Sequence, residues 1–374
     1  MPLNIPLSYT PIDPDAIKQL VDRYQKWPHE KIISDFELGL SDFTQAKHVV
    51  ALNSGTAGIH LALKAIGVDS NDEVLVSTFT YVATVNPILY LGARPIFIDV
   101  DKQSWNMDPG LLEKAIQERI NVSRKPKAIL VVHNYGMPAR AEEILNIANR
   151  YDIPVVEDAA EALGSRIGNR YVGTFGKIGI LSFNNNKILT TYGGGAILTE
   201  DGELAQKILF WAGQSRETKL YNEHKELGYN YRIGPINAAV GLSKIYNLEK
   251  EIERRRSCFE LYNSHLSKFG FQFQVEIPGS FSNRWLTTIL IDPSKTGGIT
   301  REDIRLALEK ENIESRPLWK PMHLQPIFEQ FPNYGGEVSE KLFERGLCLP
   351  SGSGLKAEEL KRVVSLISDY RQNL

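Results

Sequence analysis

Short apolar segments alternate with amphipathic segments through the first 200 residues. The apolar runs, which are candidate strands, are 49–52, 73–77, 94–100, 128–133, 155–156, 178–181 and 196–199. Segments with the 3.6-residue periodicity of helices lie between them, near 59–66, 109–119 and 141–151. Apolar runs without internal alternation are typical of strands buried on both faces, as in a parallel sheet covered by helices. The pattern therefore predicts an α/β protein with a mostly parallel central sheet.

The pattern changes toward both ends of the chain. A helical segment is expected over 15–48, and a second over 237–253 that continues to 269. Beyond it, the predicted elements are a strand at 285–291 and helices at 300–310 and 356–370. We therefore expect a large domain over residues 1–250, with an N-terminal helical segment, and a small α/β domain over residues 251–374.

Composition narrows the class of protein. The 374 residues are 42% hydrophobic and 24% charged, with a net charge of −2, as in an ordinary soluble globular protein. Basic residues are scattered, which argues against a nucleic-acid partner. The one dense cluster, Arg254–Arg256, follows three glutamates and is interpreted as a salt-bridged solvent-facing helix surface. Two cysteines without metal-ligand spacing, no secretion signal and no long apolar run predict a cytoplasmic protein without a membrane anchor.

Candidate chemistry begins with a lysine in a loop between two predicted strands. Lys187 stands in the turn-rich stretch 182–195, which ends in three glycines. A lone loop lysine is normally solvated. However, Asp158 ends the strand at 155–156, at the sheet edge where open α/β sheets bind ligands. A lysine that holds an aldehyde and a carboxylate that keeps a pyridine nitrogen protonated are what pyridoxal phosphate chemistry needs.

A possible anion site precedes these residues. Asn53-Ser54-Gly55-Thr56 connects a strand to a helix, so its backbone N–H groups and the helix dipole could hold a phosphate. The alternative is an ordinary helix cap by Ser54 or Thr56 without a ligand. The turn matches neither the P-loop nor the dinucleotide-binding pattern.

Four motifs together resemble one family. They are 53–57, 154–164, 182–195 and 228–232, and they resemble the DegT/DnrJ/EryC1/StrS family of pyridoxal phosphate-dependent nucleotide-sugar aminotransferases over almost the whole chain. The resemblance implies fold type I, similar to aspartate aminotransferase, with pyridoxal 5′-phosphate as cofactor. It also implies glutamate and a nucleotide sugar as substrates, and a homodimer with shared active sites.

The resemblance also implies roles for individual residues. Lys187 and Asp158 are the expected catalytic residues. Phe79 is expected to stack on the cofactor ring, Ala160 to lie beneath it, and Asn230 to reach the cofactor phosphate of a neighbouring subunit. The full set of expected cofactor-binding residues is Gly55, Thr56, Ala57, Phe79, Asp158, Ala160, Glu161, Ser182, Lys187 and Asn230.

Three further residues are candidates for substrate binding. His133 belongs to His133-Asn134-Tyr135-Gly136, which resembles the family's His-x-Tyr-Gly, although a structural role is the favoured interpretation. Arg316 and His323 lie in a segment that resembles one flanking the family's active-site mouth, and Arg316 could pair with an anion. Surface Arg and His residues need no such role.

The segment around Lys187 indicates which sugar the enzyme acts on. Its Phe-Asn-x-Asn-Lys-Ile and the later Leu349–Gly352 resemble members that act on UDP-linked 2-acetamido-4-keto-6-deoxyhexoses, although Asn185 replaces a common glycine. We therefore expect amino transfer from glutamate to C4 of UDP-2-acetamido-2,6-dideoxy-4-keto-hexose. The alternatives are a GDP-4-keto-6-deoxymannose 4-aminotransferase, similar to perosamine synthase, and a catalytically silent regulatory member. A Rossmann oxidoreductase is a weaker option, and Lys187 disfavours the family's dehydratase branch, which has histidine there.

Overall fold

The computed structural model describes residues 5–24 and 29–372. The strands are β1 (His48–Leu52), β2 (Glu73–Ser77), β3 (Arg94–Ile98), β4 (Ala128–Val132), β5 (Val155–Asp158), β6 (Arg166–Ile167), β7 (Arg170–Tyr171), β8 (Ile178–Ser182), β9 (Gly195–Thr199), β10 (Gln272–Phe273), β11 (Ser280–Phe281), β12 (Thr287–Leu290), β13 (Arg316–Pro317), β14 (Asn333–Tyr334) and β15 (Gly346–Leu349). The α-helices are α1 (Pro14–Tyr24), α2 (His29–Thr44), α3 (Gly55–Ala65), α4 (Val82–Tyr90), α5 (Pro109–Asn121), α6 (Ala141–Arg150), α7 (Gly202–Ala212), α8 (Pro235–Ile245), α9 (Leu248–Leu266), α10 (Pro293–Thr296), α11 (Arg301–Lys310), α12 (Glu337–Arg345) and α13 (Ala357–Gln372). Short 3-10 helices are η1 (Asn134–Gly136), η2 (Ser267–Phe269) and η3 (Met322–Leu324).

The largest sheet has the strand order β1-β9-β8-β5-β4-β2-β3-β14. The pairs from β8 through β5, β4, β2 and β3 to β14 are parallel, and only β9 pairs antiparallel with its neighbours, β1 and β8. The predicted α/β class with a mostly parallel sheet is confirmed. Because β8 and β5 are parallel, Asp158 and Ser182 lie at the same edge of the sheet, where parallel strands end.

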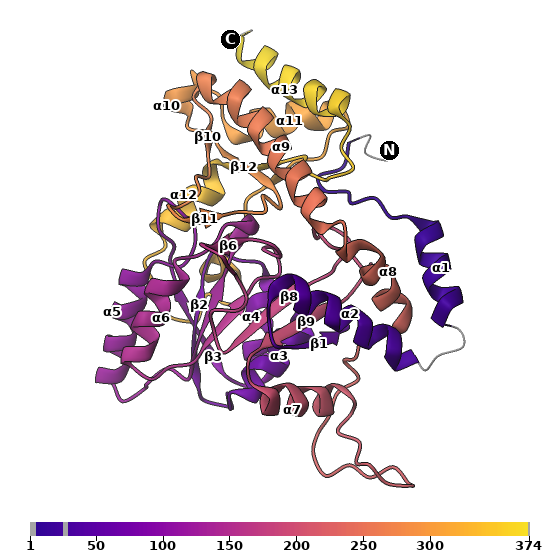
Figure 1. The fold of residues 1–374 in the computed structure, drawn as a ribbon. Helices are drawn as coiled ribbons and strands as arrows, with labels where there is room; N and C mark the ends of the chain where they lie inside the picture. The colour runs from indigo at the N-terminus through magenta and orange to yellow at the C-terminus, as the bar shows by residue number, and fades with distance from the viewer. Residues whose placement is uncertain (1–4, 25–28, 373–374) are drawn as a thin grey trace.

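Helices cover both faces of this sheet (Figure 1). Side chains alternate along each strand, so Val74 and Val76 of β2 join a core cluster with α3, α4 and α7, whereas Leu75 joins one with α5 and α6. A third cluster packs α2 and α8 against β8 and β9 through Phe36, Leu181 and other apolar residues. The sheet is therefore packed on both faces beneath the edge where the candidate site residues lie.

The C-terminal part has a sheet of its own, with the order β10-β12-β15-β13, which packs with α9, α11 and α13 (Figure 1). The predicted domain boundary at residue 250 falls inside α9, and two segments cross it. Strand β14 pairs with β3 of the large sheet, and Ile5 pairs with Ile313. The division at residue 250 stays a prediction.

Two helix predictions were too long. The expected helix over 237–269 is interrupted between Ile245 and Leu248, which separates α8 from α9. The expected helical segment over 15–48 ends earlier, because α2 stops at Thr44 and β1 begins at His48; its residues 25–28 lie outside the described part of the chain. Within the described ranges, no helix is both long and apolar enough to cross a membrane.

Candidate active site

A cavity of about 410 Å³ opens at the carboxyl edge of the large sheet. Its lining comes from the start of α3, the start of α4, the ends of β4, β5 and β8, the lysine loop and two tryptophans of the C-terminal part. The lining residues are Asn53, Ser54, Gly55, Thr56, Ile59, Thr80, Tyr81, Ala83, Thr84, Val132, Asp158, Ala160, Glu161, Ser182, Asn184, Asn186, Lys187, Gly193, Gly194, Trp285 and Trp319. Seven of the predicted site residues line this one cavity: Gly55, Thr56, Asp158, Ala160, Glu161, Ser182 and Lys187.

Asp158 is the last residue of β5 and is buried. Thr84 Oγ1 donates a hydrogen bond to its Oδ2 at 2.7 Å, and the amide of Ala160 donates to its Oδ1 at 3.1 Å. Thr80 Oγ1 in turn lies 2.8 Å from Thr84 Oγ1, so the threonine pair holds the carboxylate in one orientation. Such a buried, oriented carboxylate is suited to a protonated ring nitrogen.

Lys187 lies in the loop between β8 and β9, which closes where Ser182 pairs with Gly195. Its side chain is 13% exposed, and its Nζ is 3.5 Å from Glu161 Oε1. The same Nζ lies 4.1 Å from the centroid of the Trp285 ring, a cation–π distance. The loop therefore presents the amine to the cavity between a carboxylate and an indole rather than to bulk water.

Glu161 connects the lysine to the rest of the site. Its Oε2 accepts a hydrogen bond from the amide of Tyr135 at 2.7 Å, while its Oε1 faces Lys187. Burial raises the pKa of the Glu161 carboxyl above its ordinary value, and the neighbouring Lys187 charge opposes this effect only in part. Glu161 is therefore an electrostatic partner of Lys187.

The turn before α3 forms a second wall of the cavity. Ser54 caps the helix, because its Oγ accepts a hydrogen bond from the amide of Ala57 at 3.1 Å. Up to four amides at a helix start lack an intrahelical partner, and this cap satisfies one of them. Ala57, predicted to bind the cofactor, is thus used by the cap and does not line the cavity. A Cβ on Gly55 would lie 3.1 Å from Ser182 Cβ, so glycine permits the close approach of these two walls.

These groups fit pyridoxal phosphate. Asp158 could face the ring nitrogen, Lys187 the aldehyde, and Gly55, Thr56 and Ser182 the phosphate at the start of α3. When bound, the cofactor supplies an electron-accepting ring and a carbonyl that an amine can attack. The cap at Ser54 and the anion site, which were alternatives from the sequence, are compatible in the structure.

The ring-stacking prediction at Phe79 requires correction. Phe79 is fully buried, packs 6.1 Å from the Tyr135 ring centroid, and does not line the cavity. The chain runs on from β2 through buried residues 78–80, so Phe79 points into the core. Tyr81, at the N-cap of α4, is the aromatic residue after β2 that does line the cavity, with its ring centroid 5.3 Å from that of Trp319. We therefore propose Tyr81 for the stacking role.

The sequence did not reveal the two tryptophans that close the cavity. Tyr135 stacks between them, with centroid distances of 6.4 Å to Trp285 and 5.7 Å to Trp319 and interplanar angles of 14° and 11°. The hydroxyl oxygen of Tyr135 also accepts a hydrogen bond from the amide of Trp319 at 2.9 Å. Trp285 was predicted to lie in a strand, but β12 begins only at Thr287. The available signal for Trp319 was its segment, which also holds Arg316 and His323 and resembles one flanking the family's active-site mouth.

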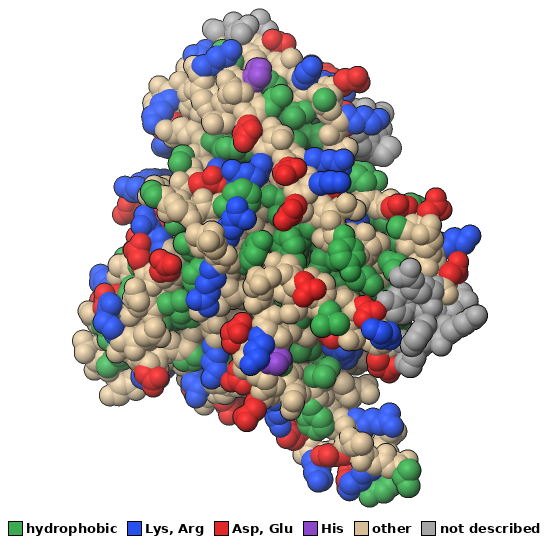
Figure 2. All heavy atoms as spheres, in the orientation of Figure 1, with side chains coloured by type: hydrophobic (Ala, Val, Ile, Leu, Met, Phe, Trp, Pro, Cys, Tyr) green, Lys and Arg blue, Asp and Glu red, His purple; other side chains and the backbone are tan. Residues whose placement is uncertain are grey.

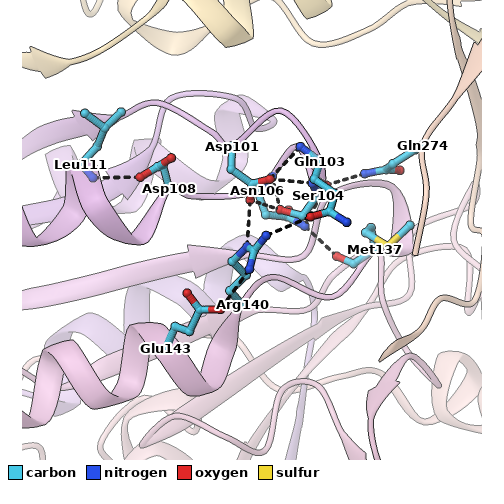
Figure 3. Close-up of polar contacts among 10 residues, drawn as sticks. All are labelled: Asp101, Gln103, Ser104, Asn106, Asp108, Leu111, Met137, Arg140, Glu143 and Gln274. Atoms are coloured by element: carbon cyan, nitrogen blue, oxygen red, sulfur yellow. Dashed lines mark hydrogen bonds and ion pairs between the residues drawn. The ribbon is translucent and has the colours of Figure 1, made fainter. Parts of the chain in front are cut away.

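A polar network supports the loop that carries Tyr135. Asn106 Nδ2 donates to the carbonyls of Met137 at 3.0 Å and Ser104 at 3.3 Å, and Gln274 Nε2 donates to the Ser104 carbonyl at 2.7 Å. Figure 3 shows Asn106 and Gln274 converging on the turn at Ser104. Because Gln274 belongs to the C-terminal part, the network holds both parts of the chain around the cavity.

His133, predicted as a substrate residue, does not reach the cavity. It is fully buried, its Nδ1 accepts a hydrogen bond from the amide of Ala139 at 3.0 Å, and its Nε2 lies 3.0 Å from Glu157 Oε2. Since Nδ1 accepts, Nε2 carries the proton and donates to the carboxylate. Both ring nitrogens are used in the core, which supports the structural interpretation of this histidine.

Arg316 and His323 also lie away from the cavity lining. The Arg316 side chain is 67% exposed and pairs with Glu314 at 2.9 Å. The His323 side chain is 8% exposed, with Nδ1 2.6 Å from Thr78 Oγ1 and Nε2 3.1 Å from Glu340 Oε1. Each of these two residues therefore has a partner within the chain. Neither lines the cavity described above.

Asn230 is exposed and is not part of the cavity wall. Its carbonyl accepts a hydrogen bond from Asn53 Nδ2 at 3.1 Å, which places it beside the turn that precedes α3. It lies in the long loop between α7 and α8, part of which extends away from the rest of the chain (Figure 1). Figure 2 shows this loop as a narrow projection with charged and apolar side chains.

Comparisons with known proteins agree with this site. Residues 13–368 match the model of the DegT/DnrJ/EryC1/StrS aminotransferase family. The chain is 43% identical over 345 residues to EpsN of Bacillus subtilis (strain 168), which is named as a candidate pyridoxal phosphate-dependent aminotransferase, covering 91% of this chain and 88% of that protein. It is 35% identical to GDP-perosamine synthase of Escherichia coli O157:H7, over 90% of each chain.

A solved structure extends the likeness to three dimensions. The crystal structure of a DegT DnrJ EryC1 StrS aminotransferase from Brucella abortus superimposes with a TM-score of 0.87 at 31% identity, covering 96% of this chain and 94% of that one. The cavity brings together a lysine, a strand-end aspartate and a helix start, the kinds of group that pyridoxal phosphate chemistry uses. The chain therefore belongs to the DegT/DnrJ/EryC1/StrS aminotransferase family and is a pyridoxal phosphate-dependent sugar aminotransferase.

Proposed function

We propose that this enzyme transfers the amino group of glutamate to C4 of a nucleotide-linked 4-keto-6-deoxyhexose, with UDP-2-acetamido-2,6-dideoxy-4-keto-hexose as the substrate. The observation that carries the chemistry is that Lys187, Asp158 and the start of α3 line one cavity. Asp158, oriented by Thr84 and the Ala160 amide, would keep the ring nitrogen of the bound cofactor protonated. Ala160 is small enough to lie beneath the ring.

Lys187 is the proposed proton carrier. With the cofactor bound to carry the amino group, Lys187 Nζ would accept the proton lost from the α-carbon of glutamate in the first half-reaction and would supply the proton gained at C4 of the sugar in the second. Glu161 Oε1, 3.5 Å from Nζ, and the Trp285 ring, 4.1 Å away, hold the amine near the reacting atoms. The buried surroundings limit access of water to the same atoms.

Support for the sugar comes from the lysine loop. Asn184 and Asn186, which belong to the segment similar to members acting on UDP-linked 2-acetamido sugars, both line the cavity. A GDP-linked 4-keto-6-deoxymannose is the second candidate, because a GDP-perosamine synthase is 35% identical over 90% of each chain. The two substrates differ in the nucleotide and in the substituent at C2, so they can be compared directly.

A competition experiment tests the assignment. Protein loaded with pyridoxal phosphate and L-glutamate receives either keto sugar, and the aminated product is identified by mass spectrometry and its amine position by NMR. We expect kcat/KM to be at least about a hundredfold higher for the UDP sugar, since a site that hydrogen-bonds a substituent discriminates strongly against its absence. A higher kcat/KM for the GDP sugar would contradict the proposed substrate. A product with its amine at C3 would contradict the proposed position of transfer. If the wild-type protein binds the cofactor but is as inactive as Lys187→Ala on both sugars, the chain is instead the catalytically silent regulatory family member.

We also propose a homodimer in which Asn230 completes the partner's cofactor site. Asn230 is exposed beside Asn53, and the preceding loop exposes Leu220, Tyr221 and Leu227. Such exposed apolar side chains are suited to contact with a second copy.

Mixing two inactive variants tests this arrangement. If Asn230 acts in the partner's site, a heterodimer of Lys187→Ala and Asn230→Ala has one site with both defects and one intact site. Refolding the two variants together at equal amounts should then restore about a quarter of wild-type activity, because half of the dimers are mixed. Activity no higher than that of the separate variants, with dimers confirmed by light scattering, contradicts the shared site.

A further inference from the structure

Arg255 is the one member of the Arg254–Arg256 run that the sequence interpretation misplaced. Arg254 is 60% exposed and pairs with Glu251 at 3.5 Å, as expected of a salt-bridged helix face, whereas Arg256 is half-buried and pairs at 2.5 Å with Glu276, which lies beyond the helix. Arg255, in contrast, has no exposed surface. A buried arginine is costly unless its donors are used, so its contacts indicate why it is there.

The Arg255 guanidinium joins three separate parts of the chain. Nη1 donates to the carbonyls of Trp285 at 2.5 Å and Ser351 at 3.4 Å. Nη2 donates to the hydroxyl oxygens of Ser8 at 3.3 Å and Thr10 at 3.0 Å. Arg255 therefore ties the N-terminal segment to the tryptophan that lies beneath the Lys187 amine and to the loop after β15.

The two hydroxyls pass this connection on to the lysine loop. Ser8 Oγ donates to the carbonyl of Asn186 at 2.9 Å, and Thr10 Oγ1 donates to the carbonyl of Lys187 at 3.3 Å. Trp285 Nε1 also donates to the Asn186 carbonyl, at 2.8 Å. All three routes from Arg255 thus end on the backbone of the lysine or of the residue before it.

Arg255 itself does not line the cavity. Burial lowers its pKa to about 10, so the guanidinium remains protonated at neutral pH. The positive charge of the guanidinium strengthens each hydrogen bond that it donates. Because the Ser8 and Thr10 hydroxyl oxygens accept from Arg255, their O–H groups are oriented to donate to the loop carbonyls.

We propose that Arg255 is a positioning residue for Lys187: through Ser8, Thr10 and Trp285 it fixes the backbone at 186–187, so that the lysine amine stays over the Trp285 ring and beside Glu161. This inference rests on the proposed role of Lys187. It makes residues 8–10 a structural part of the active site, although they are distant in sequence and outside the cavity.

The test uses the holoenzyme and no sugar or amino donor. In Thr10→Val, which keeps the side-chain shape, we expect amide hydrogen exchange at 187–189 to quicken about fivefold, the factor expected for one hydrogen bond. In Arg255→Met we expect a larger increase in exchange.

A second readout is the pH midpoint of the visible absorption band of the bound cofactor. In Arg255→Met we expect this midpoint to rise by about half a pH unit, because a buried positive charge has been removed. The matched control is Arg254→Met, which changes the neighbouring exposed arginine. It should leave both the amide exchange at 187–189 and the pH midpoint of the absorption band unchanged.

The double variant Thr10→Val/Arg255→Met completes the test. If the connection runs through Thr10, the two effects on exchange are not additive. Additive effects on exchange would show that Arg255 acts on the loop independently of Thr10, and a lower melting temperature with wild-type exchange and a wild-type band midpoint would show that it serves stability alone. Either result contradicts the proposal. If Arg255→Met does not fold, Ser8→Ala and Thr10→Val still decide the question. Because neither readout requires turnover, a wrong substrate assignment leaves this test intact.

Discussion

The floor and the mouth of the cavity are built in different ways. The floor residues Asp158 and Ser182 end neighbouring parallel strands, and Gly55 follows β1 at the same edge. The mouth is formed by Tyr81, before α4, and by Trp285 and Trp319 from the C-terminal part. Strand pairing fixes the floor, whereas packing between distant segments fixes the mouth. Changes in the floor should therefore affect the chemistry, and changes in the mouth should affect binding.

The largest effect is expected from Asp158. Asp158→Asn keeps the shape and the hydrogen bond from Thr84 but removes the charge that keeps the ring nitrogen protonated. We expect kcat to fall about a thousandfold, within the range for a group that sets protonation in catalysis, with little change in thermal stability. Steady-state kinetics and the cofactor's absorption spectrum measure this. Thr84→Val, which removes only the orienting bond, should cost about tenfold or less. Equal losses for the two variants would mean that orientation, and not charge, is what matters.

Substitutions of Tyr81 and Phe79 distinguish an effect on cofactor binding from an effect on folding stability. Tyr81→Ala removes a ring that lines the cavity, so we expect the Kd for pyridoxal phosphate to rise about tenfold while the free energy of unfolding changes little. Phe79→Ala empties a fully buried position and should lower the free energy of unfolding by about 3 kcal/mol or more. Fluorescence titration and urea unfolding measure the two quantities. Should Phe79→Leu, a milder change, weaken cofactor binding more than Tyr81→Ala does, the stacking role returns to Phe79.

A smaller, pH-dependent effect is expected at Glu161. Burial raises its pKa in the folded state, so its contribution to stability is complete below the ordinary value of 4.5 and is lost as the pH rises through the raised value. Glu161→Gln should therefore become progressively more stable than wild type over that window, by about 1.4 kcal/mol for each pH unit that separates the folded and unfolded pKa values. Above the window the difference should be constant. Urea unfolding of the cofactor-free protein from about pH 4.5 to about pH 8 measures this difference.

An exposed carboxylate gives the matched control for that experiment. Glu142→Gln, on the surface of α6, should follow the wild-type pH profile. Parallel profiles for Glu161→Gln and wild type would show that the charge of Lys187 cancels the cost of burying Glu161.

The limits of prediction from sequence follow the same division. Asp158, Ser182 and Lys187 could be placed because each stands at or just beyond a strand that its own neighbours identify, and strand direction then sets the edge. Trp285 could not be placed, because its position depends on a hydrogen bond to Asn186, 99 residues away, and on stacking against Tyr135. The assignment of Phe79 to the stacking role has a related problem: Phe79 and Tyr81 are both aromatic residues after β2, and only packing decides which of them faces the core.

The smallest effect is expected at Arg316, and it shows where the mouth ends. Its side chain is 67% exposed, pairs with Glu314 and lies outside the cavity wall. Exposed ion pairs contribute little, so Arg316→Ala should change kcat/KM for the nucleotide sugar less than about threefold and leave the melting temperature nearly unchanged. Glu314→Gln, which frees the guanidinium, is the informative partner. If Arg316→Ala raises KM tenfold and Glu314→Gln lowers it, the arginine binds the diphosphate directly, and the mouth extends beyond the tryptophans to β13.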